Sequence, residues 1–218
     1  MTSGRRTDRG LFITLEGGEG AGKTTQIESL KKYLETEGYQ TVLTREPGGT
    51  KDAEMLRGLI LDPVHDWDPM EQLLLFNTAR HQHWRQVIAP AIGRGAVVIC
   101  DRYMDSTMAY QGAAGGIRAE DISQLHDLVF AGGARPDLTL FIDVPVDIAL
   151  ERRAKRDGAG GRDRFEAADL SFHEALRRGF QDIAANNPDR VQTIDGSRAA
   201  DDVFADIRQV VGERLDHG

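Results

Sequence analysis

A short segment near the N-terminus combines residue types and spacing that suit phosphate binding. It reads Gly17-x-x-x-x-Gly22-Lys23-Thr24. Glycines let the backbone curl so that successive N–H groups point at an anion, while Lys23 can reach β- and γ-phosphates and the Thr24 hydroxyl can bind Mg²⁺. The predicted nucleotide-phosphate site comprises Gly17, Gly18, Glu19, Gly20, Ala21, Gly22, Lys23, Thr24 and Thr25.

The residues on either side of this segment support the same interpretation. The apolar run 11–15 is typical of a buried strand, and Ile27, Leu30 and Leu34 recur at helical spacing after the segment. A glycine-rich turn without a ligand is the competing interpretation, but it would not require a lysine and a threonine at these two places. The pattern therefore predicts a strand, a phosphate-binding loop and a helix in succession.

Polar residues also stand at the ends of two later predicted strands. Arg45 begins a glycine-containing loop after the strand 41–45, where it could clamp a second phosphate; the alternative is a surface salt bridge. Asp101 closes the predicted strand 96–101, and Arg102 follows it. Asp101 could hold Mg²⁺ through a water and Arg102 could clamp a phosphate, whereas the alternative is a helix N-cap beside an incidental arginine.

A long predicted helix carries two further candidates. Phe76 and Arg80 are spaced i, i+4 and share one face, so an aromatic surface for a base and donors for a carbonyl oxygen could reach the same ligand. From spacing alone, a core position for Phe76 is the commoner outcome. The six histidines form no metal-binding pattern, and His81 and His83 face different ways on a helix, which predicts surface or packing roles.

The segment 152–166 is rich in glycine at its centre and in arginine on both sides. Its basic residues would repel one another unless an anion met them. We therefore expect a short arginine-rich lid at about 152–165, which closes over a transferred phosphoryl group, excludes water and adds positive charge. A solvated linker between two helices is the alternative.

Composition limits the class of protein. The chain has 218 residues, 40 % hydrophobic and 28 % charged, which fits a single domain over 1–218 with a flexible tail at 1–10. Its net charge of −8 argues against binding a nucleic acid polymer or an anionic membrane, because both need a basic face. A single cysteine, Cys100, excludes an intramolecular disulfide, and no apolar run is long enough to span a membrane, so the expected compartment is the cytoplasm.

Apolar runs of strand length alternate with helical patterns along the chain. The expected strands are 11–15, 41–45, 96–101, 138–143 and 191–195, and the later expected helices include 53–61, 70–92 and one at the C-terminus. This alternation predicts a three-layer α/β fold, with a five-stranded parallel sheet covered by helices on both faces. Ligands bind beyond the carboxyl ends of such strands, so the candidate residues should open onto one crevice.

Together, several segments resemble the bacterial thymidylate kinases of the P-loop nucleoside monophosphate kinase family, over essentially 11–215. The phosphate-binding loop alone specifies only a superfamily, whereas the loop Arg45-Glu46-Pro47-Gly48-Gly49-Thr50 combined with Asp101-Arg102-Tyr103 is far narrower. The matching segments are 16–25, 44–50, Phe76-x-x-x-Arg80, 101–103, 106–112, 135–140 and 163–166.

The resemblance implies a kinase that uses ATP and Mg²⁺ to phosphorylate dTMP to dTDP. It implies that Phe76 stacks on thymine, that Arg80 bonds the carbonyl edge of the base, and that Thr107 lies near the base. By the same resemblance Tyr110 lies against the sugar and disfavours a 2′-hydroxyl, and Gln111 belongs to the same substrate-binding set.

The phosphate-binding groups follow from the same resemblance. Arg45 and Arg102 would grip the acceptor phosphate, and Glu19 would contact the region of the sugar 3′-hydroxyl. Some family members place an arginine inside the P-loop, whereas 18–21 contains none here, which resembles the bacterial arrangement with lid arginines. The expected catalytic residues are Lys23, Arg102, Arg153, Arg156 and Arg162, and the expected magnesium ligands are Thr24 and Asp101. A homodimer is expected by resemblance only.

The chemistry implied needs no general base. The acceptor is a phosphate monoester with a second pKa of about 6, so it is already mostly a dianionic nucleophile near neutral pH. Two alternatives stay open: a kinase for dUMP, UMP or AMP, and a P-loop switch that hydrolyses nucleotide to change partners. Against the switch, the chain has no guanine-reading Asn/Thr-Lys-x-Asp segment, and the strand 96–101 ends in Asp-Arg instead of Asp-Glu.

Overall fold

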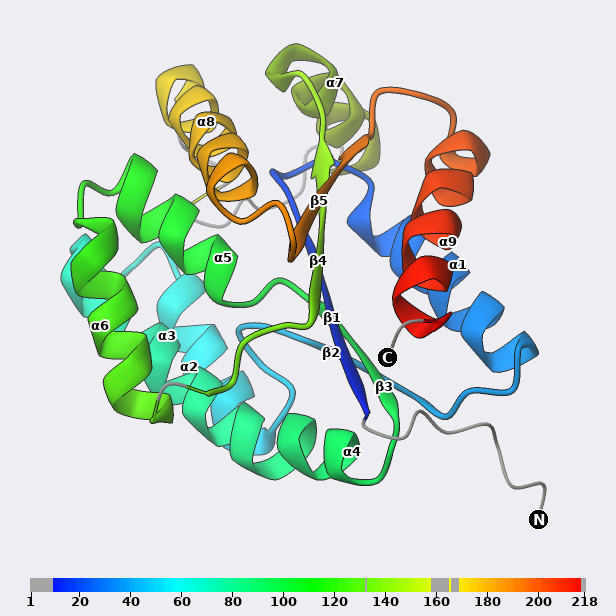
Figure 1. Cartoon of the computed structure of the whole chain (residues 1–218). Helices are drawn as coiled ribbons and strands as arrows, with labels where there is room; N and C mark the ends of the chain where they lie inside the picture. Colours follow the sequence, from blue (N-terminus) through cyan, green and yellow to red (C-terminus); the bar gives the residue numbers. More distant parts are fainter. Residues whose placement is uncertain (1–9, 132, 158–164, 166–168, 217–218) are drawn as a thin grey trace.

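The computed structural model describes residues 10–131, 133–157, 165 and 169–216. At its centre lies a five-stranded sheet whose paired strands all run parallel, in the order β2-β3-β1-β4-β5 (Figure 1). The strands are β1 (Leu11–Glu16), β2 (Thr41–Arg45), β3 (Val97–Asp101), β4 (Leu138–Asp143) and β5 (Val191–Asp195). The predicted strands agree with these bounds to within one residue at each end.

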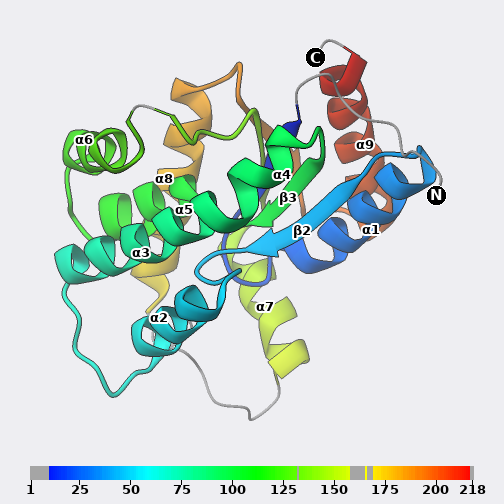
Figure 2. The ribbon, with the colours of Figure 1, turned by 90° about the horizontal axis from the view of Figure 1, so that it is seen from below.

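Helices cover both faces of the sheet, as the alternation of patterns predicts. Figures 1 and 2 show α1 and α9 against one face and α3, α4, α5 and α8 against the other, which confirms the three-layer α/β fold. The helical segments are α1 (Lys23–Thr36), α2 (Lys51–Leu61), α3 (Pro69–His83), η1 (Trp84–Ile88), α4 (Ala89–Gly93), α5 (Met104–Thr107), η2 (Met108–Ala114), α6 (Ala119–Phe130), α7 (Val146–Asp157), α8 (Leu170–Asn186) and α9 (Ala200–Asp216).

Alternating side chains of β1 enter two separate cores. Ile13 and Leu15 are fully buried with residues of α1 and α9, whereas Phe12 points to the other face and meets the Tyr103 ring edge-on, with ring centroids 4.9 Å apart. Because both faces are buried, the strand reads as a continuous apolar run. This burial holds β1 in the middle of the sheet, directly before the phosphate-binding loop.

The helix expected over 70–92 is divided into three parts. α3 ends at His83, the π-helical turn η1 follows, and the short helix α4 completes the segment. Pro90 lies in the first turn of α4 and has no N–H to donate, so an unbroken α-helical ladder cannot run through this point. α3 begins where Asp68 and Glu71 form a capping box, each side chain accepting from the other residue's backbone N–H.

The register of the sheet brings the candidate residues together. Leu15 of β1 lies opposite Asp101 of β3, and Arg45 of β2 lies opposite the same Asp101 on its other side. The connection from β3 to β4 passes from one side of β1 to the other, which makes a switch point beside β1. Open α/β sheets bind their ligands at such points, beyond the carboxyl ends of the strands.

Candidate active site

A cavity of about 380 Å³ lies where β1, β2 and β3 end. Its walls come from the phosphate-binding loop, the loop after β2, helix α3, the turn after β3 and η2. The structure thus gathers residues that are far apart in the chain. The predicted site residues that line it are Glu19, Gly20, Ala21, Gly22, Lys23, Thr24, Thr25, Arg45, Phe76, Arg80, Asp101, Arg102, Thr107, Tyr110 and Gln111.

The phosphate-binding loop curls around the lysine that follows it. Gly20 has a left-handed backbone with φ 77°, and a Cβ at this residue would lie 2.1 Å from the carbonyl oxygen of Ala149 in α7. The Nζ of Lys23 donates to the carbonyl oxygens of Gly17 and Gly18, each at 3.1 Å. Burial lowers the pKa of Lys23 below its ordinary value. The carbonyl groups of Gly17 and Gly18, two residues that do not line the cavity, therefore hold the Lys23 ammonium group in place.

Arg102 connects this loop to the turn after β3. Its backbone is left-handed, with φ 66°, which is uncommon for a residue other than glycine. Nη1 donates to the Gly17 carbonyl at 2.9 Å and to Ser106 Oγ at 3.2 Å, and Nη2 forms an ion pair with Glu19. Burial favours a lower pKa for Arg102, but Tyr110, Glu19 and other acidic neighbours outweigh it and raise the pKa.

Glu16, the last residue of β1, was not among the predicted site residues. It is fully buried and accepts hydrogen bonds from the Tyr103 backbone N–H at 2.7 Å and from Ser106 Oγ at 2.5 Å. Burial, with a further contribution from Asp105, raises the pKa of Glu16 to about 8. These hydrogen bonds fix the chain just beyond Arg102. The only sequence sign of this role is an acidic residue at the end of an apolar strand.

Arg45 forms the surface salt bridge that the sequence offered as the alternative to phosphate binding. Its Nη2 forms an ion pair with Glu54 Oε2 of α2 at 3.0 Å, and both side chains are exposed. The other carboxylate oxygen of Glu54 accepts from the Gly49 backbone N–H at 3.0 Å. The arginine also lines the cavity, so phosphate binding by Arg45 stays a prediction.

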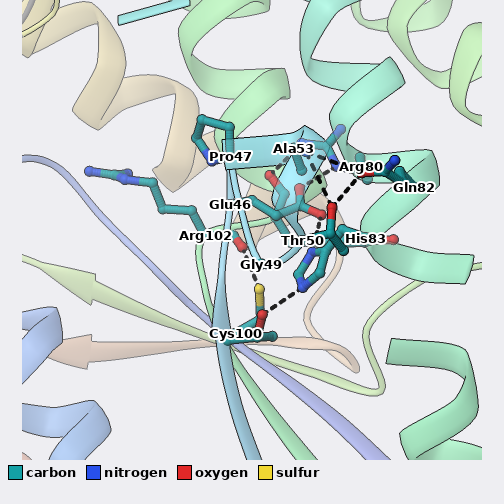
Figure 3. Close-up of polar contacts among 12 residues, drawn as sticks. Glu46, Pro47, Gly49, Thr50, Ala53, Arg80, Gln82, His83, Cys100 and Arg102 are labelled. Atoms are coloured by element: carbon teal, nitrogen blue, oxygen red, sulfur yellow. Dashed lines mark hydrogen bonds and ion pairs between the residues drawn. The ribbon is translucent and has the colours of Figure 1, made fainter. Parts of the chain in front are cut away.

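Arg80 is 3 % exposed and is held from two sides. Its Nε donates to Glu46 Oε2 at 2.7 Å, while Nη2 donates to Thr107 Oγ1 at 2.8 Å and to the Tyr103 carbonyl at 3.2 Å. Figure 3 shows Glu46 and Arg80 pointing toward one another beneath the loop after β2. Burial would lower the pKa of Arg80, but Glu46 and its other neighbours outweigh burial and raise it.

Aromatic rings form one wall of the cavity, called the aromatic wall below. Phe76 is half-buried, and its ring centroid lies 6.5 Å from that of Phe165, which in turn meets the Tyr110 ring edge-on at 5.2 Å. Tyr110 also donates to Glu19 at 3.4 Å. Gln111 is buried and donates to the side chain of Gln72 in α3 at 2.9 Å. A flat apolar ring system with a few polar groups suits a nucleobase and sugar.

The magnesium prediction fits one feature of this cavity. Oδ1 of Asp101 is buried and makes no hydrogen bond with any described residue, and Thr24 is exposed in the first turn of α1. No group of three or more His, Cys, Asp and Glu residues that could hold a metal occurs in the described part of the chain. A Mg²⁺ ion bound through few protein groups, several waters and substrate phosphates matches this donor set.

Two arginines that line the cavity were not among the predicted site residues. Arg57 of α2 donates from Nη1 to the Pro47 carbonyl at 2.9 Å. Arg152 of α7 donates to the carbonyl oxygens of Gly196 at 2.7 Å and Ser197 at 3.2 Å, so it joins α7 to the loop after β5. An arginine on an amphipathic helix is usually solvated, so Arg57 carried no sequence signal, whereas Arg152 was expected only as the first residue of the lid.

The predicted lid is described only in part. Its first residues, including Arg153, belong to α7, and Phe165 lies beside the aromatic wall. Arg162 and the side chain of Arg156 lie outside the described residues.

Comparison of the whole chain with known proteins identifies its family. The thymidylate kinase family model matches residues 15–207. The chain belongs to the thymidylate kinase family. It is 48 % identical to the thymidylate kinase of a Bradyrhizobium species over 212 residues, 97 % of this chain and 93 % of the relative. It is 47 % identical to that of Caulobacter vibrioides over 208 residues, covering 95 % and 98 % of the two chains.

A solved structure agrees with the sequence comparisons. The crystal structure of thymidylate kinase from Ehrlichia chaffeensis superposes with a TM-score of 0.76 at 36 % identity, covering 94 % of this chain and 99 % of that one. Within the described residues no helix is both long and apolar enough to cross a membrane. The family resemblance inferred from the sequence is confirmed.

The packing of the loop predicts unequal effects at two of its glycines. Gly20→Ala should lower the free energy of unfolding by roughly 2 kcal/mol or more, because a left-handed backbone and a clash with Ala149 act together. Gly18→Ala is the matched control, since a Cβ there meets no atom within 4 Å. Urea denaturation measures both variants. Equal losses of stability would show that the loop is not packed as described.

The raised pKa of Glu16 predicts a pH-dependent stability. The folded chain holds the proton up to about pH 8, whereas the unfolded chain releases it near the ordinary value of 4.5, so this stabilisation is lost as the pH rises through that window. The free energy of unfolding of the wild type should therefore fall relative to that of Glu16→Gln between about pH 5 and pH 8. Urea denaturation of both proteins at several pH values measures this difference. A pH-independent difference would contradict the assignment.

Proposed function

We propose that this protein transfers the γ-phosphoryl group of ATP directly to the 5′-phosphate of dTMP, giving dTDP and ADP, with Mg²⁺ as the metal. The observation that carries the proposal is the position of Arg102. Its guanidinium bonds Gly17 and Glu19 in the phosphate-binding loop and lies 5.2 Å from the ring centroid of Tyr110 in the aromatic wall, so one cation contacts both the donor side and the acceptor side of the cavity.

The donor site is the phosphate-binding loop. Backbone N–H groups of 17–25 cradle the ATP phosphates, and Lys23 leaves its internal carbonyl partners to bind the β- and γ-phosphates. Thr24 and Asp101 would hold Mg²⁺, which would supply positive charge to neutralise the transferred group. The buried, unpartnered Oδ1 of Asp101 supports its part in this set.

The acceptor site is the aromatic side of the cavity. Phe76 stacks on the thymine, Arg80 bonds its carbonyl edge and Thr107 lies near the base. Tyr110 lies against the sugar, and Gln111 belongs to the same substrate-binding set. Support comes from the hydrogen bond that already joins Arg80 to Thr107 and from the ring contacts of Tyr110.

The acceptor phosphate and the sugar are held by charged groups at the rim. Arg45 exchanges its ion pair with Glu54 for the acceptor phosphate, which Arg102 grips from the other side. Glu19 contacts the region of the 3′-hydroxyl. Since the acceptor is already a dianion near neutral pH, the residues hold two repelling phosphates in line and no general base is required.

The lid and the assembly complete the proposal. One or more of Arg153, Arg156 and Arg162 stabilise the transferred group once both substrates are bound. The protein is a cytoplasmic homodimer. Leu74 of α3 and Leu128 of α6 are exposed on helices that contact one another, which supports an apolar partner surface there. Sedimentation equilibrium tests the dimer.

The substrate is tested with a panel of acceptors. ATP turnover with dTMP, dUMP, UMP and AMP is followed by ADP release, and dTMP should give the highest kcat/KM because the groups at the base and sugar suit thymine and a 2′-deoxyribose. A preference for AMP or UMP would reject the proposed substrate. Substantial hydrolysis of ATP without any acceptor would favour a nucleotide-hydrolysing switch instead.

The bridging role of Arg102 is tested by removing its side chain. Arg102→Ala should lower kcat for dTMP by about 100-fold or more, because a charge aimed at the transferring phosphoryl group is lost. Lys155→Ala is the control, since Lys155 is an exposed lysine on α7 paired with Glu151, and its kcat should stay within about twofold of wild type. Equal, mild effects of both changes would refute the assignment.

A further inference from the structure

His83 lies at the centre of a buried polar cluster of which the proposed chemistry uses only Arg80. The cluster consists of Thr44, Glu46, Arg80 and His83, contributed by β2, the loop after it and α3. His83 is 0 % exposed, whereas His81 on the same helix is exposed. Figure 3 shows the His83 ring directed at the loop after β2, with Glu46 between it and Arg80.

The two carboxylate oxygens of Glu46 are divided between two partners. Oε2 accepts from Arg80 Nε at 2.7 Å, and Oε1 lies 3.0 Å from His83 Nδ1. On its far side, His83 Nε2 lies 2.6 Å from Thr44 Oγ1 in β2. Because a carboxylate can only accept, the hydrogen-bond network assigns the hydrogen to Nδ1, and Thr44 can donate to Nε2. His83 thereby ties a strand to the carboxylate that holds Arg80.

The same imidazole packs against the loop that carries the phosphate clamp. A Cβ at Gly49 would lie 2.4 Å from His83 Nε2, so backbone and ring are in direct contact. The Gly49 N–H donates to Glu54, which pairs with Arg45. His83 thus contacts both Glu46, which holds Arg80, and the loop that follows Arg45. His83 does not line the cavity.

We propose that His83 is a positioning residue for acceptor recognition: through Glu46 it fixes the Arg80 guanidinium in the orientation that reads the carbonyl edge of the acceptor base. This inference rests on the proposed function, because it assumes that Arg80 meets the base. His83 itself touches no substrate.

The physical reason lies in the freedom of a long side chain. An arginine loses considerable rotamer entropy when it binds, and this cost falls if the side chain is already fixed in the binding orientation. Without His83, Oε1 of Glu46 would lose its buried donor, and the carboxylate could rotate away from Arg80 Nε to find another. Arg80 would then keep its charge and its place on α3 but lose its orientation.

The experiment compares His83→Ala with His81→Ala, the same residue type on the same helix. KM for dTMP should rise about tenfold or more in His83→Ala, while kcat and KM for ATP stay within about twofold, because only acceptor recognition is disturbed. The inhibition constant Ki of 5-methyl-dCMP is measured as well. This nucleotide has an amino group where thymine has its C4 carbonyl, and its N3 carries no hydrogen. The ratio of this Ki to the KM for dTMP should fall about tenfold in His83→Ala alone.

Two amide variants of His83 distinguish a role in orienting Arg80 from a role in merely filling space in the core. The amide nitrogen of His83→Asn can take the place of Nδ1, so this variant should recover most of the discrimination between dTMP and 5-methyl-dCMP. His83→Gln has a similar volume but reaches toward Nε2, and it should resemble His83→Ala. This pair decides the question if His83→Ala does not fold. Equal discrimination in the Asn and Gln variants would overturn the inference, as would a kcat loss with an unchanged ratio.

The wild-type protein separates this inference from the proposed function. If it does not phosphorylate dTMP with ATP, the proposed function fails before any variant is compared. If it does, and His83→Ala matches His81→Ala in KM and in the Ki ratio, only the positioning role is rejected.

Discussion

The parallel pairing of β1 with β3 is the constraint on which the cavity depends. With Leu15 opposite Asp101, the chain leaves β3 directly beside the phosphate-binding loop, and the Arg102 N–H donates to the Leu15 carbonyl at 3.0 Å. β2 adds to the same edge, where the Glu46 N–H donates to the Asp101 carbonyl at 2.9 Å. A shift of one residue would turn every side chain of β3 to the opposite face. Donor and acceptor groups would then no longer face each other.

Two pairs of opposite charges fix side chains near the cavity in one orientation. Arg80 pairs with Glu46, and Arg190 makes two bonds to Asp105, at 2.6 Å and 2.8 Å. Removing one partner of such a pair typically costs about 3–5 kcal/mol, because the other charge stays buried alone. Such pairs contribute little net stability, but each fixes a side chain in one orientation. Rigid donors are what the recognition of a planar base and two phosphates requires.

Much of the fold could be predicted because its signals are local. β1, β3 and β4 are buried apolar runs, and the loop at Gly17 has a spacing that few other structures require. The Glu46 cluster could not be found this way, since Glu46, Arg80 and His83 interact only after β2 and α3 pack together. The helical spacing predicted surface or packing roles for His81 and His83, and it could not identify the partners of His83. The role of Glu16 could not be predicted for the same reason, because its partners Tyr103 and Ser106 lie in the segment after β3.

The central claim is that donor and acceptor occupy one continuous cavity with Arg102 between them. A ligand in which adenosine and thymidine are joined through a 5′–5′ polyphosphate chain tests this most directly, by calorimetric titration against ATP and dTMP alone. The account predicts one ligand per chain, bound about 100-fold or more tightly than either nucleotide, because the second half binds without a second loss of translational freedom. Binding no tighter than ATP, or two ligands per chain, would contradict it.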